Sequence, residues 1–217
     1  MTFSIVARDA RTGELGVATA TAGPAVGSLV PHARSNSAAI ATQAMTNPYL
    51  AFDMLEQVDD MGVEAAMTAA LSADPESERR QVIAIDAQGR MAAWTGAHCQ
   101  DYAGHIKGDN VAVAGNILAG ERVLQAMLEA ASTPAPLTDR LLAALLAGQS
   151  AGGDKRGINS AALKIYGREA YPDVDLRVDW SAAPLSELSG LMERTLKGGY
   201  ADFFGEVTRR GIPHPPV

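Results

Sequence analysis

Apolar and polar side chains alternate with a period of two at the start of the chain, which is the pattern of a β-strand. The segment Thr2–Ala7 shows this alternation, and Leu15–Ala20 follows after the turn-forming residues 9–13. Two such segments joined by aspartate, threonine and glycine predict a hairpin. Both are rich in small and β-branched residues, which suits close packing between layers.

Strands and helices follow one another in blocks along the rest of the chain. The other segments predicted to be strands are Leu29–Val30, Ala38–Ala44, Gln81–Ile85, Arg90–Gly96, Asn110–Asn116, Ser160–Ile165 and Leu176–Asp179. The segments predicted to be helices are Leu50–Val58, Val63–Leu71, Glu121–Ala131, Asp139–Gly148 and Ser186–Leu196. In the first two helices apolar residues recur every three or four positions, so one face of each would cover a sheet. Thr138 is expected to cap the helix that starts at Asp139.

The order of these elements indicates the fold class. Strands and helices come in separate runs, which favours an α+β fold of antiparallel sheets with helices layered outside over a parallel βαβ sheet. Residues 1–197 are expected to form this domain. The tail, residues 198–217, contains Gly198 and Gly199 and ends in a proline-rich segment, and we expect it to pack on the body or on a partner subunit.

Composition and charge exclude several classes of function. The chain has 217 residues, of which 47% are hydrophobic and 20% charged, and this is ordinary globular composition. A net charge of -7 argues against nucleic-acid binding, which needs clustered lysine and arginine. No segment approaches the ~20 apolar residues that span a bilayer, and the N-terminus lacks the pattern of a signal peptide. A single cysteine cannot form an internal disulfide, so we expect a cytoplasmic protein.

The single cysteine, Cys99, stands next to His98. Neighbours on an extended segment point to opposite faces, so His98 is poorly placed to activate the thiol. We interpret Cys99 as a semi-buried small residue rather than as a nucleophile.

Four motifs carry a resemblance to a known family. They are Met-Thr-Phe-Ser-Ile-Val-Ala-Arg-Asp at the start, Ala41–Ala44 with Asn47 and Pro48, Gly115–Gly120, and Ala151–Gly157. The motifs occur in the right order, and the match runs from Thr2 to about Leu196. The chain resembles the family catalogued as domain of unknown function 1028.

That family resembles the N-terminal nucleophile (Ntn) hydrolases, and the resemblance implies a fold and an activity. The implied fold is a four-layer αββα sandwich of two antiparallel sheets. The implied chemistry is hydrolysis of an amide by a residue at the start of the first strand. In this sequence that residue is Thr2.

The chemistry of Thr2 depends on removal of Met1. A threonine hydroxyl is a weak nucleophile at neutral pH and needs a base. Without Met1, Thr2 has a free α-amino group with an unperturbed pKa of about 7.7–8.0, which can accept the hydroxyl proton directly or through water. The alternative is that Thr2 is an ordinary β-branched strand residue.

An oxyanion formed at the substrate carbonyl needs donors that are already in place. The candidates are Asn116, at the end of its strand, and the amides between Gln43 and Asn47, which we assign to substrate binding. Asn116 follows Gly115, and an equally good interpretation is that its amide closes a turn.

The loop Ala151–Gly157 holds the densest polar cluster of the sequence. Its glycine N–H groups, with Lys155 and Arg156, can bind a carboxylate or phosphate while Asp154 orients one of the two basic side chains. The spacing does not match a P-loop. A solvated turn with a local ion pair explains the cluster equally well.

No motif predicts a metal ion or another cofactor. The four histidines are scattered, without the spacing of metal ligands. Asp173, Asp175 and Asp179 can share a strand face and hold a cation, but solvent exposure is the simpler interpretation.

The sequence thus predicts a cytoplasmic amidohydrolase that acts on a small amide, peptide or ureido compound. Thr2 and Asn116 would be catalytic, and Gln43, Asn47, Asp154, Lys155 and Arg156 would bind substrate. A rival hypothesis is a non-catalytic binding or scaffolding protein that has kept the sandwich. We expect a homodimer or larger homo-oligomer, because an antiparallel sandwich leaves sheet edges exposed.

Overall fold

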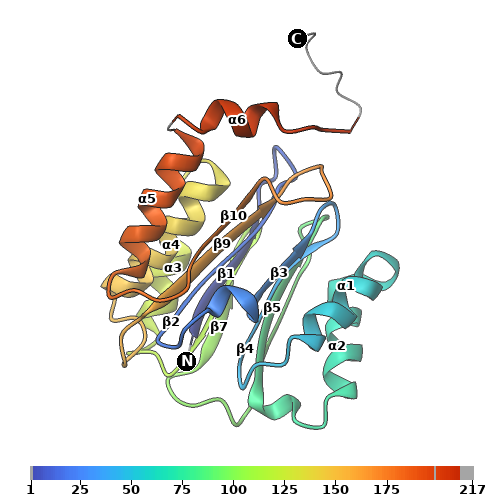
Figure 1. Cartoon of the computed structure of the whole chain (residues 1–217). Coiled ribbons are helices and arrows are strands. Elements are labelled where there is room, and N and C mark those ends of the chain that lie inside the picture. The colour runs from blue at the N-terminus through green and yellow to red at the C-terminus, as the bar shows by residue number, and fades with distance from the viewer. Residues whose placement is uncertain (1, 198, 211–217) are drawn as a thin grey trace.

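Two antiparallel β-sheets face each other at the centre of the computed structural model, and helices cover both outer faces (Figure 1). The structure describes residues 2–197 and 199–210. The α+β fold class and the four-layer αββα architecture expected from the sequence are confirmed.

The larger sheet has six strands in the order β10-β9-β2-β1-β8-β7. Its strands are β1 (Thr2–Arg8), β2 (Leu15–Thr21), β7 (Gly104–Lys107), β8 (Val111–Asn116), β9 (Ser160–Tyr166) and β10 (Val174–Val178). The central strand β1 pairs with both β2 and β8, so Thr2 lies opposite Thr21 on one side and opposite Asn116 on the other. The first residue of β1 is therefore next to the last residues of both neighbouring strands.

The smaller sheet has four strands in the order β3-β4-β5-β6. They are β3 (Pro31–Arg34), β4 (Ala38–Ala44), β5 (Arg80–Asp86) and β6 (Met91–Thr95). Strands β4 and β5 pair over their whole length, which places Gln43 opposite Gln81. These two glutamines lie at the same end of the sandwich as Thr2, because Gln43 donates hydrogen bonds to the carbonyl of Thr2 and to Gln81.

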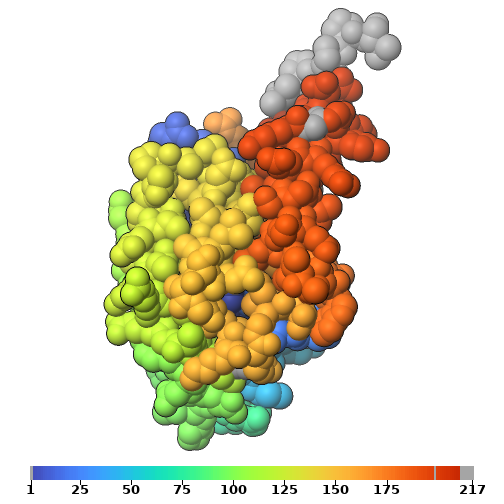
Figure 2. Space-filling model, turned by 90° about the vertical axis from the view of Figure 1, so that its left-hand side faces the viewer, coloured from blue at the N-terminus to red at the C-terminus, as the bar shows by residue number. Residues whose placement is uncertain are grey.

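The helices lie where their apolar faces cover a sheet. Helices α3 (Arg122–Ala131), α4 (Leu137–Ser150) and α5 (Pro184–Leu196) cover the larger sheet, and Figure 2 shows this face of the molecule. Helices α1 (Tyr49–Met61) and α2 (Val63–Ala73) cover the smaller sheet and are separated by Gly62, whose φ of 82° suits glycine. Short 3-10 helices occur at Val26–Ser28 and Ser77–Arg79. None of the helices in residues 2–197 and 199–210 has the length and apolar character needed to cross a membrane.

Alternation along β1 decides which side chains enter the space between the sheets. Phe3 and Ile5 belong to the core under α3 and α4, whereas Val6 belongs to the core between the two sheets. Because side chains alternate with a period of two, Thr2 and Ser4 share the face of Val6. The fold therefore turns the Thr2 side chain toward the opposing sheet.

Several predicted boundaries are wrong. The strand expected at Leu29–Val30 begins later, as β3 at Pro31. Thr138 does not cap a helix, because α4 already begins at Leu137, whose side chain is buried in the core, and Pro136 takes the N-cap position. Strand β7 and the short helix α6 (Ala201–Glu206) were not expected from the sequence.

The described part of the tail contacts the loop between β9 and β10. The Tyr171 hydroxyl donates a 2.7 Å hydrogen bond to the carbonyl of Thr208, and the backbone N–H of Arg210 donates to the Glu169 carboxylate at 3.2 Å. Helix α6 lies at the C-terminal end of α5 (Figure 1). The end of the predicted tail, residues 211–217, lies outside the described residues, and the division of the chain at residue 197 stays a prediction.

Candidate functional site

The space between the two sheets is apolar at one end and polar at the other. The residues that make the polar end are Thr2, Ser4, Thr19, Thr21, Gln43, Gln81 and Asn116, all buried. We call this group the inter-sheet polar cluster. Its members carry only hydroxyl and amide groups, so none of its side chains can act as a general base near neutral pH.

Thr2 is held in this cluster through its side chain and its backbone. It is 5% exposed, and its hydroxyl donates a hydrogen bond of 3.2 Å to the hydroxyl oxygen of Thr21. Its carbonyl accepts a hydrogen bond of 3.4 Å from the Gln43 side chain. Gln43 in turn accepts from the Ser4 hydroxyl at 2.5 Å. Both the position and the direction of Thr2 are therefore fixed by neutral groups.

Gln81 connects the two sheets at this end. Its Oε1 accepts hydrogen bonds from Gln43 at 2.8 Å and from Asn116 at 3.0 Å. Its Nε2 lies 3.0 Å from the carbonyl of Gly104 and 2.9 Å from that of Gly115, both in the larger sheet. One buried amide thus orients the side chain of Asn116 directly beside Thr2.

A cavity of about 220 Å³ opens next to Asn116. The described residues that line it are Ala44, Met45, Arg79, His98, Cys99, Gln100, Asn116 and Ile117. Two of these, Ala44 and Ile117, have φ values of 69° and 52°, in the left-handed region that residues with a Cβ rarely adopt. Each follows or ends a strand, so the backbone is bent where β4 and β8 reach the cavity. Strained backbone of this kind is concentrated at functional sites.

Cys99 lines this cavity but has the properties of a structural thiol. Its Sγ donates to the carbonyl of Arg80 at 3.4 Å, and burial raises the pKa of the thiol above its usual range. A raised pKa leaves less of the nucleophilic thiolate at neutral pH. The structure therefore agrees with the interpretation of Cys99 as a half-buried small residue.

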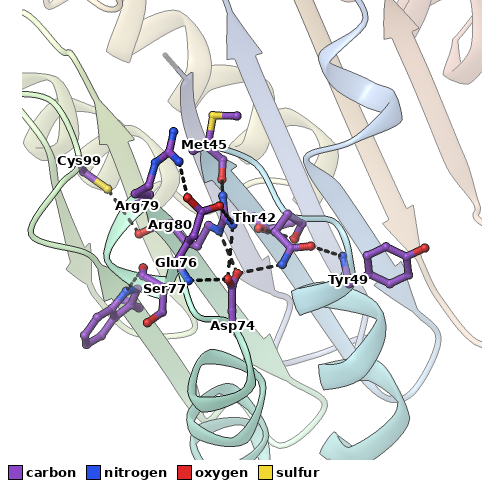
Figure 3. A network of polar contacts seen from close by, with 11 residues as sticks. Thr42, Met45, Tyr49, Asp74, Glu76, Ser77, Arg79, Arg80 and Cys99 are labelled. Atoms are coloured by element: carbon purple, nitrogen blue, oxygen red, sulfur yellow. Dashed lines mark hydrogen bonds and ion pairs between the residues drawn. The ribbon is translucent and has the colours of Figure 1, made fainter.

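A second polar network, centred on Arg80 and Asp74, stabilises the wall of the cavity (Figure 3). Arg80 and Asp74 form a buried ion pair of 2.8 Å, with side chains 9% and 5% exposed. The hydrogen bond from Arg80 is the main reason why the pKa of Asp74 is lowered to about 2. Arg80 also donates to the carbonyl of Met45 at 2.7 Å. The loop after β4 is therefore tied to the loop before β5.

Asn47 belongs to this second network rather than to the surroundings of Thr2. Its Nδ2 donates to Asp74 at 2.8 Å, and its Oδ1 accepts from the backbone N–H of Tyr49 at 3.1 Å. The nitrogen and the oxygen of the Asn47 amide thus both form hydrogen bonds within the protein, at the start of α1. Gln43 is fully buried, and its amide is used within the inter-sheet polar cluster.

The loop Ala151–Gly157 lies against the segment that follows Asn116. Leu118 forms an isolated β-bridge with Asp154, and the backbone N–H of Lys155 donates to the carbonyl of Ile117 at 3.3 Å. The buried Asp154 carboxylate accepts from the backbone N–H of Arg156 at 2.8 Å and pairs with its guanidinium at 3.4 Å. Lys155 reaches the carbonyl of Asp101 at 3.4 Å. The loop therefore supports the end of β8, and the Asp154–Arg156 ion pair agrees with both sequence interpretations of the loop.

The acidic residues of β10 and its flanks are paired with basic side chains. Asp175 contacts Lys164 at 3.3 Å, and Asp179 contacts Arg177 at 2.7 Å. Asp173 lies 3.7 Å from Arg209 of the tail. In the part of the chain that the structure describes, no group of three or more His, Cys, Asp or Glu side chains is arranged to hold a metal ion.

Sequence reasoning missed Gln81, Arg79 and Ile117. Gln81 is the second residue of β5, a strand buried on both faces, so alternation does not mark it. Arg79 belongs to a charged turn that looks like solvated surface in the sequence. The one available signal was Asn116-Ile117 itself, where a strand rich in small residues ends in an amide.

Comparison with known proteins identifies the family. The family described as "Family of unknown function (DUF1028)" matches residues 2–188. The chain belongs to this family. A crystal structure of the DUF1028 protein SPO2555 from Silicibacter pomeroyi is 33% identical, covers 95% of this chain and 94% of that chain, and superposes with a TM-score of 0.88. None of the curated proteins matches the chain.

More distant similarities join this DUF1028 chain to Anbu proteins. Anbu (ancestral beta-subunit) from Yersinia bercovieri is 12% identical with a TM-score of 0.42, over 97% of this chain and 100% of that chain. An Anbu (Gly-1) mutant from Hyphomicrobium sp. strain MC1 is 14% identical with a TM-score of 0.42, over 94% and 99% of the two chains. Similarity at this level carries no argument about function.

Proposed function

We propose that the protein is an N-terminal nucleophile amidohydrolase in which Thr2, exposed at the N-terminus by removal of Met1, attacks the carbonyl of a small amide, peptide or ureido substrate. The observation that carries the proposal is the position of Thr2. It begins a central strand, turns its hydroxyl between the sheets, and lies opposite Asn116, which also lines a cavity.

The base in this proposal is the α-amino group of Thr2. The inter-sheet polar cluster around Thr2 contains only hydroxyl and amide side chains, so the amine is the group there that can accept a proton near neutral pH. The Thr2 oxygen forms a bond to the substrate carbonyl carbon while its proton passes to the amine. The amine then gives that proton to the leaving nitrogen as the C–N bond breaks.

Asn116 serves as an oxyanion donor in the same mechanism. One N–H of its side-chain amide is directed to Gln81, and an amide nitrogen carries a second N–H. That second N–H and nearby main-chain N–H groups would hold the negative charge that develops on the carbonyl oxygen. Water then hydrolyses the acyl-Thr2 ester, releases the acid and restores the hydroxyl. The reaction requires no metal ion or cofactor.

The proposal is tested by intact-mass spectrometry before and after exposure to a β-lactone, which acylates nucleophilic hydroxyl groups. The expected result is a mass without methionine and a single adduct that maps to Thr2, and that is lost in Thr2→Ala. Retained methionine together with no adduct would contradict the mechanism and favour the rival hypothesis of a non-catalytic binding protein.

The same proposal includes a homo-oligomer in which the tail, residues 198–217, packs on the domain of residues 1–197 or on a partner subunit. Its support is the exposure of aromatic side chains near and on α6, where Tyr200 is 68% and Phe203 61% exposed. Large exposed aromatic groups of this kind mark interaction surfaces. Light scattering on the intact chain should give a multiple of the 22.6 kDa monomer mass, reduced in Phe203→Ser. A monomer in both proteins would contradict this part.

A further inference from the structure

The cavity beside Asn116 lies between the ends of strands from both sheets. Ala44 and Met45 border it from the smaller sheet, and Asn116 and Ile117 border it from the larger one. Its volume of about 220 Å³ is below the roughly 300–1,000 Å³ typical of pockets for drug-sized ligands. It therefore suits one end of a small substrate rather than a polypeptide segment.

The described lining of the cavity contains a cationic side chain and no carboxylate, although the whole chain is acidic. The chain carries a net charge of -7, yet the eight described lining residues include Arg79 and no aspartate or glutamate. A recess whose described lining has one permanent cation and no carboxylate attracts an anionic group.

The Arg79 side chain is available to bind an anionic group of a ligand. Its side chain is 46% exposed, and its partner in the structure is the Glu76 carboxylate, itself 48% exposed. Glu76 is also held by Arg80 at 3.2 Å, so it keeps a partner when Arg79 binds elsewhere. An exposed ion pair contributes little to stability, which makes this exchange easy. Figure 3 shows Arg79 beside Met45 and Cys99, two other lining residues.

The wall that carries Arg79 is held in place before any ligand binds. The backbone N–H of Met45 donates to the carbonyl of Arg79 at 3.1 Å, and the Arg80 side chain holds the carbonyl of Met45 at 2.7 Å. The Cys99 thiol donates a hydrogen bond to the carbonyl of Arg80. A wall fixed by its own hydrogen bonds loses little conformational entropy on binding.

We infer that this cavity binds a carboxylate on the substrate, with Arg79 as the residue that recognises it and Asn116 marking the side on which the scissile carbonyl lies. The substrate class is then a small amide that carries a carboxylate, such as the monoamide of a short dicarboxylic acid. Binding of the carboxylate stands on the cavity alone, whereas the assignment to a substrate rests on the proposed function.

Isothermal titration calorimetry with glutarate tests the binding step on the full chain. Glutaramide, which has the same length without the charges, is the control ligand. Arg79→Gln is compared with Arg122→Gln, which removes the same charge from an exposed position at the start of α3. We expect glutarate to bind in preference to glutaramide, at least about tenfold more weakly in Arg79→Gln, and unchanged in Arg122→Gln, as for loss of one charged hydrogen bond.

Three results would overturn the inference: no glutarate binding to the native chain, equal binding of glutaramide, or the same glutarate affinity in Arg79→Gln as in Arg122→Gln. The experiment also separates this inference from the proposed function. Glutarate binding lost in Arg79→Gln, together with a Thr2 that no β-lactone acylates, would leave a carboxylate-binding site and remove the hydrolase. Acylation of Thr2 without glutarate binding would support the hydrolase and remove the carboxylate-binding site.

Discussion

The side-chain amide of Asn116 donates a hydrogen bond of 3.0 Å to the amide oxygen of Gln81, across the space between the two sheets. The same oxygen accepts from Gln43, whose amide also reaches the carbonyl of Thr2. The orientation of Asn116 and the position of Thr2 are thus set by one chain of neutral amides. A buried chain of this kind is costly to interrupt, because each group that loses its partner stays away from water.

Replacement of Gln81 by alanine is expected to lower the free energy of unfolding by about 2–4 kcal/mol. The change leaves amide groups of Gln43 and Asn116 and the carbonyl of Gly115 without their partner in a buried place. Urea denaturation measures the loss. Gln125→Ala, on an exposed face of α3, is the control and should change stability by less than about 0.5 kcal/mol. Equal effects of the two substitutions would show that Gln81 does not connect the sheets.

Arg80 and Arg79 are neighbours in the sequence with different predicted effects. Arg80→Gln leaves the buried carboxylate of Asp74 unpaired, which is expected to cost about 3–5 kcal/mol. Arg79→Gln breaks an exposed ion pair and should lower the free energy of unfolding far less than Arg80→Gln does. Denaturant titration of both variants checks the difference. Similar losses would mean that the network of Figure 3 is not what fastens the wall of the cavity.

The pH dependence of stability is expected to report on Asp74. The pKa of its carboxyl is lowered in the folded state from 3.8 to about 2, mainly by the hydrogen bond from Arg80. A carboxyl group with a lowered pKa contributes stability that is present above its unfolded pKa and is lost as pH falls through the folded value. We therefore expect a loss of about 2 kcal/mol between pH 4 and pH 2, which Asp74→Asn should no longer show. The difference between the two unfolding curves isolates this group from the other acids.

Alternation and helical spacing predicted most strands and helices well, because both are local properties, whereas the four-layer arrangement was implied by the family resemblance. The hairpin of β1 and β2 and the helices α1 and α2 follow from residues that are near in the chain. The inter-sheet polar cluster is different, since Gln81 meets Gln43 and Asn116 only after both sheets have formed. The cavity likewise combines residues of four separate segments, at 44–45, 79, 98–100 and 116–117. The cavity could not be predicted from the sequence, because it depends on how the two sheets pack and local patterns do not describe that packing.

Gly96 allows a test of packing near the cavity, with Gly190 of α5 as the control. A Cβ on Gly96 would lie 2.3 Å from the carbonyl oxygen of Glu78, a backbone atom of the turn that carries Arg79. Gly96→Ala should therefore destabilise the fold by about 2–3 kcal/mol, the range typical of overpacking. Gly190, inside α5, has nothing within 4 Å of the same added atom, so Gly190→Ala should stabilise by about 0.5–1 kcal/mol. Thermal unfolding of both variants gives the comparison, and a harmless Gly96→Ala would contradict the close approach.

Substitutions of Thr2 distinguish its proposed role as a nucleophile from its role as a strand residue. Thr2→Ala loses the hydrogen bond to Thr21, which should cost about 1 kcal/mol while the fold is kept, and it should abolish acylation. Thr2→Ser keeps the hydroxyl and should keep acylation. Because the deprotonated amine is the base, the acylation rate should rise with pH through about 7.7–8.0 and then level off. Mass spectrometry of timed samples measures the rate, and any fraction that retains Met1 should stay unlabelled. A rate that does not change between pH 6 and pH 9 would mean that another group takes the proton.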